Sequence, residues 1–117
     1  MKLLIADDEK LTREGIRDSL DLEALGISGV FLGDDGVHGL ETTVDELPDI
    51  VLTDIRMPRM NGVQMAEQIL AANPGTVIIF MSAYSDKEYL KAAIKLKAVS
   101  YVEKPLDMRA LKLYLGT

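Results

Sequence analysis

Short apolar runs alternate with amphipathic stretches along the whole chain, and this alternation restricts the possible fold more than any other feature. Each run is only a few residues long and ends in a polar turn, and the apolar residues of the following stretch recur every three or four positions. Such runs predict strands buried on both faces, and the stretches between them predict helices. The expected strands are 3–6, 30–32, 49–53, 77–81 and 99–103.

The helices are predicted from their apolar spacing and from the residues that end them. Glycine and proline are the strongest ending signals, because glycine adopts left-handed backbone and proline cannot continue a helix. The expected helices contain Leu11, Ile16 and Leu20 and end near Gly26; contain Val37, Leu40, Val44 and Leu47 and end at Pro48; contain Val63, Ala66, Ile69 and Leu70 and stop at 73–75; follow a cap at Ser85 or Asp86 and contain Leu90, Ala93 and Ile94; and run from near Asp107 through Leu111 and Tyr114 or Leu115 to Gly116.

Strict strand–helix alternation predicts an α/β fold with a doubly wound, five-stranded parallel sheet and helices on both faces. The common flavodoxin-like strand order for five such strands is 2-1-3-4-5. A chain of 117 residues with 48% hydrophobic residues has enough apolar side chains for one core. We therefore expect residues 1–117 to form a single domain.

Composition excludes several classes of function. The chain has no cysteine, so neither a disulfide framework nor a thiolate metal site is possible, and this suits the reducing cytoplasm, where we expect the protein. A net charge of −6 repels nucleic acid, so we expect no direct contact between this domain and DNA or RNA. No apolar run approaches the roughly 20 residues of a membrane span, and we expect no membrane partner.

Chemically active side chains follow the ends of four different predicted strands. Asp7 and Asp8 come after the first strand, Asp54 after the third, Ser82 after the fourth and Lys104 after the fifth. The carboxyl ends of parallel strands share one edge of a sheet, and ligands bind there where the strand order reverses. Taken singly, each residue is more often structural, since an Asp-Asp pair commonly forms a solvated turn or a helix cap. Their joint placement favours a functional site.

This group of side chains is complete for phosphoryl transfer onto a carboxylate. Three acidic groups near one another repel, and hard oxygen ligands in this number suit Mg²⁺ or Mn²⁺. An Asp carboxylate can attack phosphorus and form an aspartyl phosphate. Lys104 and a metal ion would neutralise the transferring group, and Ser82 would supply a hydroxyl donor.

Four motifs resemble those of response-regulator receiver domains, in the same order and at the same spacings over the whole chain. Each motif alone is weak, but the combination is highly specific. The motifs are Ile5-Ala6-Asp7-Asp8-Glu9, Leu52-Thr53-Asp54-Ile55-Arg56-Met57-Pro58-x-Met60-Asn61-Gly62, Met81-Ser82-Ala83 and Tyr101-Val102-Glu103-Lys104-Pro105.

The resemblance implies a phosphoryl acceptor and a metal site. Asp54 is implied to be the aspartate that a sensor histidine kinase phosphorylates. Asp8 is implied to bind Mg²⁺ directly, Asp7 to act mainly through water, and Arg56 to contribute its backbone carbonyl. The kinase is therefore the expected partner.

The resemblance also implies a conformational switch. Ser82 is similar to the hydroxyl residue that senses the phosphoryl group, and Lys104 to the lysine that pairs with it, with a cis peptide bond before Pro105. Tyr101 occupies the aromatic switch position, which turns inward when Ser82 moves. Homodimerisation through the face of the fourth and fifth helices is expected to follow phosphorylation.

A narrower resemblance concerns residues 84–89 and 93–98, which are similar to receivers joined to AraC-type helix-turn-helix domains. We expect the chain to be an excised piece of such a transcriptional regulator. Residues two positions after Asp54 and Ser82, namely Arg56 and Tyr84, are expected to flank the open side of the site. Tyr84 would shield an acyl phosphate from water, and Arg56 would either shield it or pair with its oxygens.

Three other functions were weighed against this one. A haloacid-dehalogenase-like phosphatase also uses an aspartyl nucleophile, but it needs an acid two residues later, where this chain has Arg56. A receiver-like binding module without phosphorylation would not need the acid, hydroxyl and lysine together. A flavodoxin-like cofactor carrier would need a phosphate-binding loop after the first strand, where Asp7 and Asp8 stand instead.

Overall fold

The computed structural model describes residues 1–96 and 99–116 and contains one parallel sheet. Its strand order is β2-β1-β3-β4-β5, so the order predicted from the sequence is confirmed. The strands are largely apolar because both faces of the sheet are covered, as the short apolar runs predict. The strands are β1 (Lys2–Ala6), β2 (Gly29–Gly33), β3 (Ile50–Asp54), β4 (Val77–Ser82) and β5 (Val99–Glu103).

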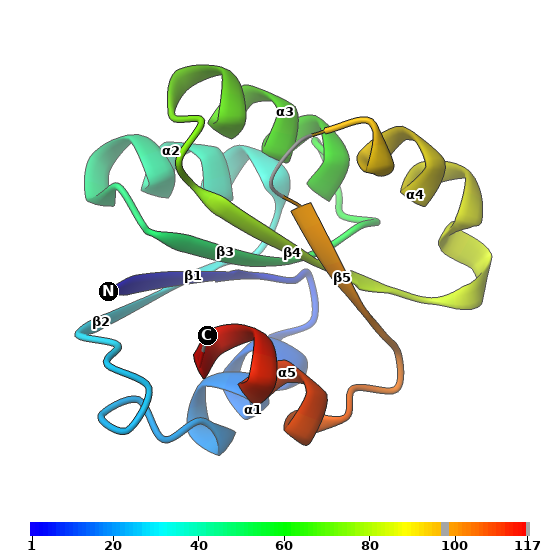
Figure 1. Ribbon diagram of the computed structural model, residues 1–117. Coiled ribbons are helices and arrows are strands. Elements are labelled where there is room, and N and C mark those ends of the chain that lie inside the picture. The colour runs from blue at the N-terminus through cyan, green and yellow to red at the C-terminus, as the bar shows by residue number, and fades with distance from the viewer. Residues whose placement is uncertain (97–98, 117) are drawn as a thin grey trace.

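Helices cover both faces of the sheet (Figure 1): α1 and α5 pack on one face, and α2, α3 and α4 on the other. Over the described part of the chain, none of these helices is both long and apolar enough to cross a membrane. The helices are α1 (Lys10–Ser19), α2 (Gly36–Glu46), α3 (Gly62–Ala72), α4 (Lys87–Ile94) and α5 (Met108–Gly116), with a short 3-10 turn η1 (Tyr84–Asp86) before α4.

The two faces of the sheet contribute to two separate apolar clusters. Leu3 and Leu52 pack with residues of α1 and α5, whereas Leu4, Val51 and Phe80 pack under α3 and α4. Successive residues of a strand point to opposite faces, so a strand covered on both sides must be apolar throughout. Complete burial of each such side chain contributes roughly 1.5–3 kcal/mol to stability. The core therefore fixes the sheet, and the sheet fixes the positions of its polar strand ends.

The end predicted for the first helix is wrong. Helix α1 ends at Ser19 rather than near Gly26, and residue 20 already has extended backbone. Leu11, which the apolar spacing places on the buried face, is 85% exposed. The residues between Ser19 and β2 form turns, in which Gly26 adopts a positive φ of 71°.

The apolar face predicted for the second helix is also partly wrong. Val44 and Leu47 are exposed, and Leu47 is not helical but caps the helix with left-handed backbone, φ 50°. The buried positions of α2 are Gly36, Gly39 and Thr43. Small residues face inward here because α2 approaches its neighbours closely, and apolar spacing does not report that approach.

Candidate functional site at the carboxyl ends of the strands

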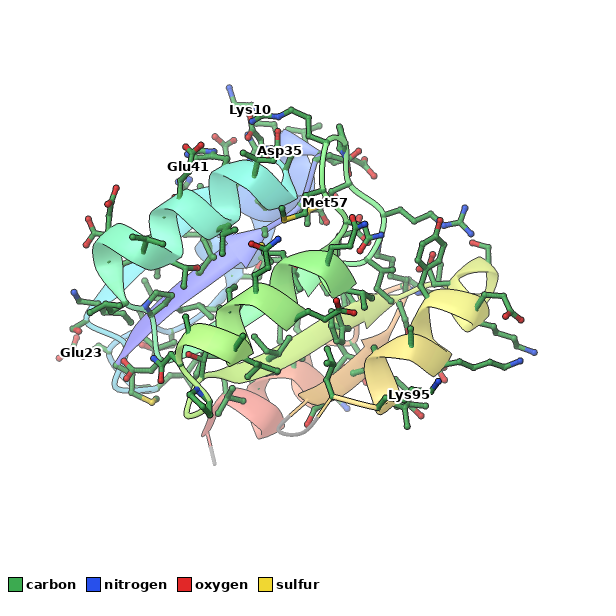
Figure 2. All side chains as sticks on the ribbon, turned by 90° about the horizontal axis from the view of Figure 1, so that it is seen from above. Lys10, Glu23, Asp35, Glu41, Met57 and Lys95 are labelled. Atoms are coloured by element: carbon green, nitrogen blue, oxygen red, sulfur yellow. The ribbon has the colours of Figure 1, made fainter. Side chains whose placement is uncertain are left out.

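The loops after β1, β2 and β3 meet at one end of the molecule, as the labelled Lys10, Asp35 and Met57 show in Figure 2. Strands β1 and β3 are neighbours, with Ala6 paired to Thr53. This register brings the residues that follow, Asp7 and Asp54, next to each other. One carboxylate oxygen from each of Asp7, Asp8 and Asp54 lies within 4.8 Å of the others.

Asp7 is a buried carboxylate with one oxygen unpartnered. It is 1% exposed; its Oδ1 accepts a hydrogen bond from the Glu9 backbone N–H at 2.8 Å, and its Oδ2 has no partner among the described residues. Burial raises the pKa of Asp7 to about 6, and the charges of Asp54 and Asp8 add to this effect. A buried oxygen without a donor, on a carboxylate that lies close to two others, fits a small divalent cation with oxygen ligands.

Asp54 ends β3 and is held on one side by a cation. Its Oδ1 accepts hydrogen bonds from the Ile55 backbone N–H at 2.8 Å and from Lys104 Nζ at 2.8 Å. Burial opposes the charge on Lys104, but the hydrogen bond from Lys104 to Asp54 and the charges of Asp54 and Asp7 outweigh it, so the pKa of Lys104 is raised. Lys104 therefore remains an ammonium group, which can neutralise a further anion beside Asp54.

The loop that follows Asp54 is fixed by close backbone packing. Thr53 Oγ1 donates a hydrogen bond to the Asp54 carbonyl oxygen at 2.8 Å. A Cβ atom at Gly62 would collide with that same carbonyl oxygen, so only glycine fits at the first residue of α3. Asn61 caps α3 by accepting from the Gln64 backbone N–H at 2.8 Å. These contacts hold residues 55–61 beside the acidic cluster.

Ser82 and Tyr101 line the same pocket. Ser82 ends β4 and is 5% exposed, and its backbone carbonyl accepts from the Lys104 N–H at 2.8 Å. Tyr101 in β5 is 45% exposed. The pocket has a volume of about 220 Å³ and is lined also by Ala83 and Leu90. The exposed Tyr101 thus borders a space that it shares with Ser82.

A comparison with known protein families shows the family to which the chain belongs. A family model described as the response regulator receiver domain matches residues 3–115. The chain belongs to this receiver domain family. The cis peptide bond expected for the family is present between Lys104 and Pro105.

Relatives of this receiver domain are named as transcriptional regulators. The transcriptional regulatory protein HptR of Staphylococcus aureus is 36% identical over 98% of this chain, which matches 45% of HptR. The receiver domain thus spans about half the length of the curated relatives it matches. Among solved structures, a two-component transcriptional regulator AraC from Clostridium phytofermentans is 45% identical with a TM-score of 0.93, covering 99% of this chain and 90% of that one. The REC domain of AraT, a response regulator from Geobacillus stearothermophilus, is 32% identical with a TM-score of 0.90, covering 97% and 88%.

The structure describes the side chain of Arg56 but not that of Tyr84, the two residues expected to flank the site. The Arg56 side chain binds the turn before α4: its Nε lies 3.0 Å from Asp86 Oδ1, and its Nη2 donates to the Ser85 carbonyl oxygen at 2.6 Å. The Tyr84 side chain lies outside the described residues, so its expected shielding function stays a prediction. Sequence reasoning took Asp86 only as a possible helix cap and missed its ion pair with Arg56.

Asp7→Asn is expected to raise the free energy of unfolding of the receiver domain by about 1 kcal/mol in metal-free buffer at neutral pH. The substitution removes one of three mutually repelling carboxylates and places an amide N–H₂ donor where Oδ2 has no partner. Urea unfolding with and without Mg²⁺ measures the effect. The added stability from Mg²⁺ should be smaller in the variant than in the wild type. A variant that is less stable than the wild type without metal would contradict the repulsion described here.

Proposed function

We propose that Asp54 accepts a phosphoryl group from the phosphohistidine of a sensor histidine kinase. The observation that carries this proposal is the position of the Asp54 carboxylate between the Lys104 ammonium group, 2.8 Å away, and the carboxylates of Asp7 and Asp8. Receiver domains as a family interact with such kinases. Intact mass after treatment with acetyl phosphate and Mg²⁺ tests the proposal directly.

We further propose that Asp7, Asp8, Asp54 and the backbone carbonyl of Arg56 hold Mg²⁺, or Mn²⁺ in its place. Support comes from the buried, unpartnered Oδ2 of Asp7 and from the short distances among the three carboxylates. When bound, the ion would neutralise negative charge on the phosphoryl oxygens during transfer. The acids would otherwise repel the phosphoryl donor.

The transfer itself uses the residues around Asp54. A carboxylate oxygen of Asp54 attacks phosphorus as the phosphorus–nitrogen bond to the donor imidazole breaks, and the departing imidazole keeps the electron pair of that bond and takes a proton from solvent. Lys104 is placed to hold one phosphoryl oxygen, because its Nζ already contacts Asp54. Ser82 ends the neighbouring strand, paired through Met81 to Asp54, and its hydroxyl can donate to another phosphoryl oxygen.

Arg56, two positions after Asp54, favours acceptance of a phosphoryl group over turnover of phosphate esters. A haloacid-dehalogenase-like phosphatase would need a general acid there, and Arg56 cannot act as one at neutral pH. Its guanidinium group is instead bound to Asp86 and Ser85. The geometry therefore supports a phosphorylated switch more strongly than an enzyme that hydrolyses small phosphate esters.

We propose that the switched domain controls transcription in a longer protein. The names of HptR and of the AraC-type structural relative support this, and so does the charge of −6, which disfavours direct DNA contact by this domain. The DNA would be bound by another part of the regulator.

Activation with beryllofluoride and Mg²⁺ is expected to turn Tyr101 inward and to promote homodimers. Movement of Ser82 toward the phosphoryl group would open the pocket between Ser82 and Tyr101, and ring burial would then change the outer face of β5. Sedimentation velocity and the NMR signals of the Tyr101 ring measure the two effects. An unchanged sedimentation coefficient together with an unchanged ring environment would contradict the switch; a Tyr101→Ala variant serves as the control for signal assignment.

A further inference from the structure

The loop between β3 and α3 is attached to its surroundings by two arginine–aspartate pairs. On one side, Arg59 Nε lies 2.7 Å from Oδ2 of Asp35, which precedes α2. On the other side, Arg56 Nε lies 3.0 Å from Oδ1 of Asp86, which precedes α4. Both aspartates are buried, at 7% and 3% exposure. The same loop carries the residues next to Asp54, so these pairs connect the site to two different helices.

The Arg56 side chain makes three contacts with the start of α4. Besides the ion pair with Asp86, its Nη2 donates to the Ser85 carbonyl oxygen at 2.6 Å, and its guanidinium carbon lies 5.3 Å from the centre of the Tyr89 ring. A planar guanidinium group with two polar partners and an aromatic face has a defined orientation. The side chain of Arg56 is nevertheless 55% exposed, so its charge can reach another anion without crossing the core.

Asp86 connects this arginine to the switch residue. While Oδ1 faces Arg56, Oδ2 accepts a hydrogen bond from the Ala83 backbone N–H at 2.7 Å. Asp86 therefore does not cap α4 with its side chain, as one of the two sequence alternatives predicted, but holds the turn before it. Ala83 directly follows Ser82. One buried carboxylate thus binds both the loop of Asp54 and the backbone next to Ser82.

We propose that Arg56 and Asp86 form a latch that holds the turn 83–86, and with it Ser82, in the resting position. This inference rests on the proposed function, in which Ser82 moves toward a phosphoryl group on Asp54. Such a movement shifts Ala83 and pulls Asp86 away from the guanidinium group of Arg56. A phosphoryl group is also a rival anion for Arg56, since it adds charge and strong acceptor oxygens two residues away. Phosphorylation and latch opening therefore favour each other.

The Arg59–Asp35 pair supplies a matched control within the same loop. Asp35 caps α2 by accepting from the His38 backbone N–H at 2.8 Å, and the Gly36 N–H donates to the Met60 carbonyl oxygen at 3.1 Å. These contacts connect the loop to α2 and not to the turn that follows Ser82. Disruption of this pair should change local stability without changing the balance between resting and active states.

The first experiment compares beryllofluoride affinity, in the presence of Mg²⁺, for the wild type, Asp86→Asn and Arg59→Gln. Asparagine at 86 keeps an acceptor for the Ala83 N–H but loses the charge that binds Arg56. We expect Asp86→Asn to bind beryllofluoride about fivefold more tightly, the lower end of typical coupling between sites, and Arg59→Gln to bind as the wild type does. Unchanged or weaker binding by Asp86→Asn, or equal tightening by Arg59→Gln, overturns the latch.

A second experiment reads the latch without any phosphoryl mimic. A double-mutant cycle of Arg56→Gln and Asp86→Asn, measured by urea unfolding of the metal-free protein, should show coupling of about fivefold in the unfolding constant. Additive effects overturn the latch even where the wild type binds beryllofluoride. A wild type that binds no beryllofluoride overturns the proposed function as well. Failure of the latch and failure of the proposed function therefore give different results.

Discussion

Asp54→Asn is expected to abolish the uptake of a phosphoryl group by this receiver domain. Wild-type protein treated with acetyl phosphate and Mg²⁺ should gain the mass of one phosphoryl group, and the variant should gain none. The reason is that an amide oxygen is not a competent nucleophile toward phosphorus, whereas a carboxylate oxygen is, and that of Asp54 lies next to Lys104. Intact-protein mass spectrometry at matched times measures both.

The substitution is well suited to this test because it leaves the local contacts possible. The Asn oxygen can still accept from the Ile55 N–H and from Lys104, as Asp54 Oδ1 does at 2.8 Å in each case. Asp45→Asn, which removes an exposed carboxylate from α2, is the control and should be phosphorylated as fast as the wild type. Phosphorylation that persists in Asp54→Asn at the wild-type rate would show that the acceptor is another residue.

The fold was predictable because its strands are buried on both faces. Leu4 and Val51 are fully buried, and their neighbours along β1 and β3 are buried as well, so these strands read as short continuous apolar runs. Alternation with helices then leaves few topologies, since crossovers are right-handed and short. The order of the strands followed from this general constraint rather than from any single residue.

Helix ends and helix faces were less predictable because local spacing does not report tertiary distance. The periodicity of Val37, Leu40, Val44 and Leu47 is genuine, yet α2 approaches α3 closely at Gly39. A Cβ atom there would lie 2.6 Å from the sulfur of Met65 in α3. In the sequence, a glycine at such a contact indicates only a low helix propensity and gives no sign of the contact.

The candidate site was predictable where strand ends determine it and not where partners come from loops. Asp7, Asp54, Ser82 and Lys104 follow directly from the shared edge of a parallel sheet. Asp86 had no comparable signal: an acidic residue before a helix predicts a cap, and nothing in the spacing points to Arg56 on a different loop. Pairs of this kind depend on how two loops approach each other, which only the folded chain determines.

The two neighbouring acids of the proposed metal site, Asp7 and Asp8, have different surroundings. Asp8 is exposed, whereas Asp7 is buried and already uses Oδ1 to hold the Glu9 N–H. We infer that Asp8 binds Mg²⁺ directly and Asp7 mainly through water. Loss of a direct ligand should cost more affinity than loss of a water-mediated one.

Asp8→Ala is therefore expected to weaken Mg²⁺ binding about a hundredfold, and Asp7→Ala about tenfold, the range over which the loss of supporting groups around metals usually acts. The exposed position of Asp8 means that its removal leaves the core intact, so the loss can be assigned to the ion. Calorimetric titration of Mg²⁺ at fixed pH and ionic strength measures the affinities. Glu23→Ala is the control, because it removes the same charge and Glu23 lies at the end of the molecule opposite Asp35 and Met57 (Figure 2). Equal Mg²⁺ affinity of the wild type and Asp8→Ala would exclude Asp8 as a direct ligand. Equal losses of Mg²⁺ affinity in Asp8→Ala and Glu23→Ala would show that the effect comes from net charge alone.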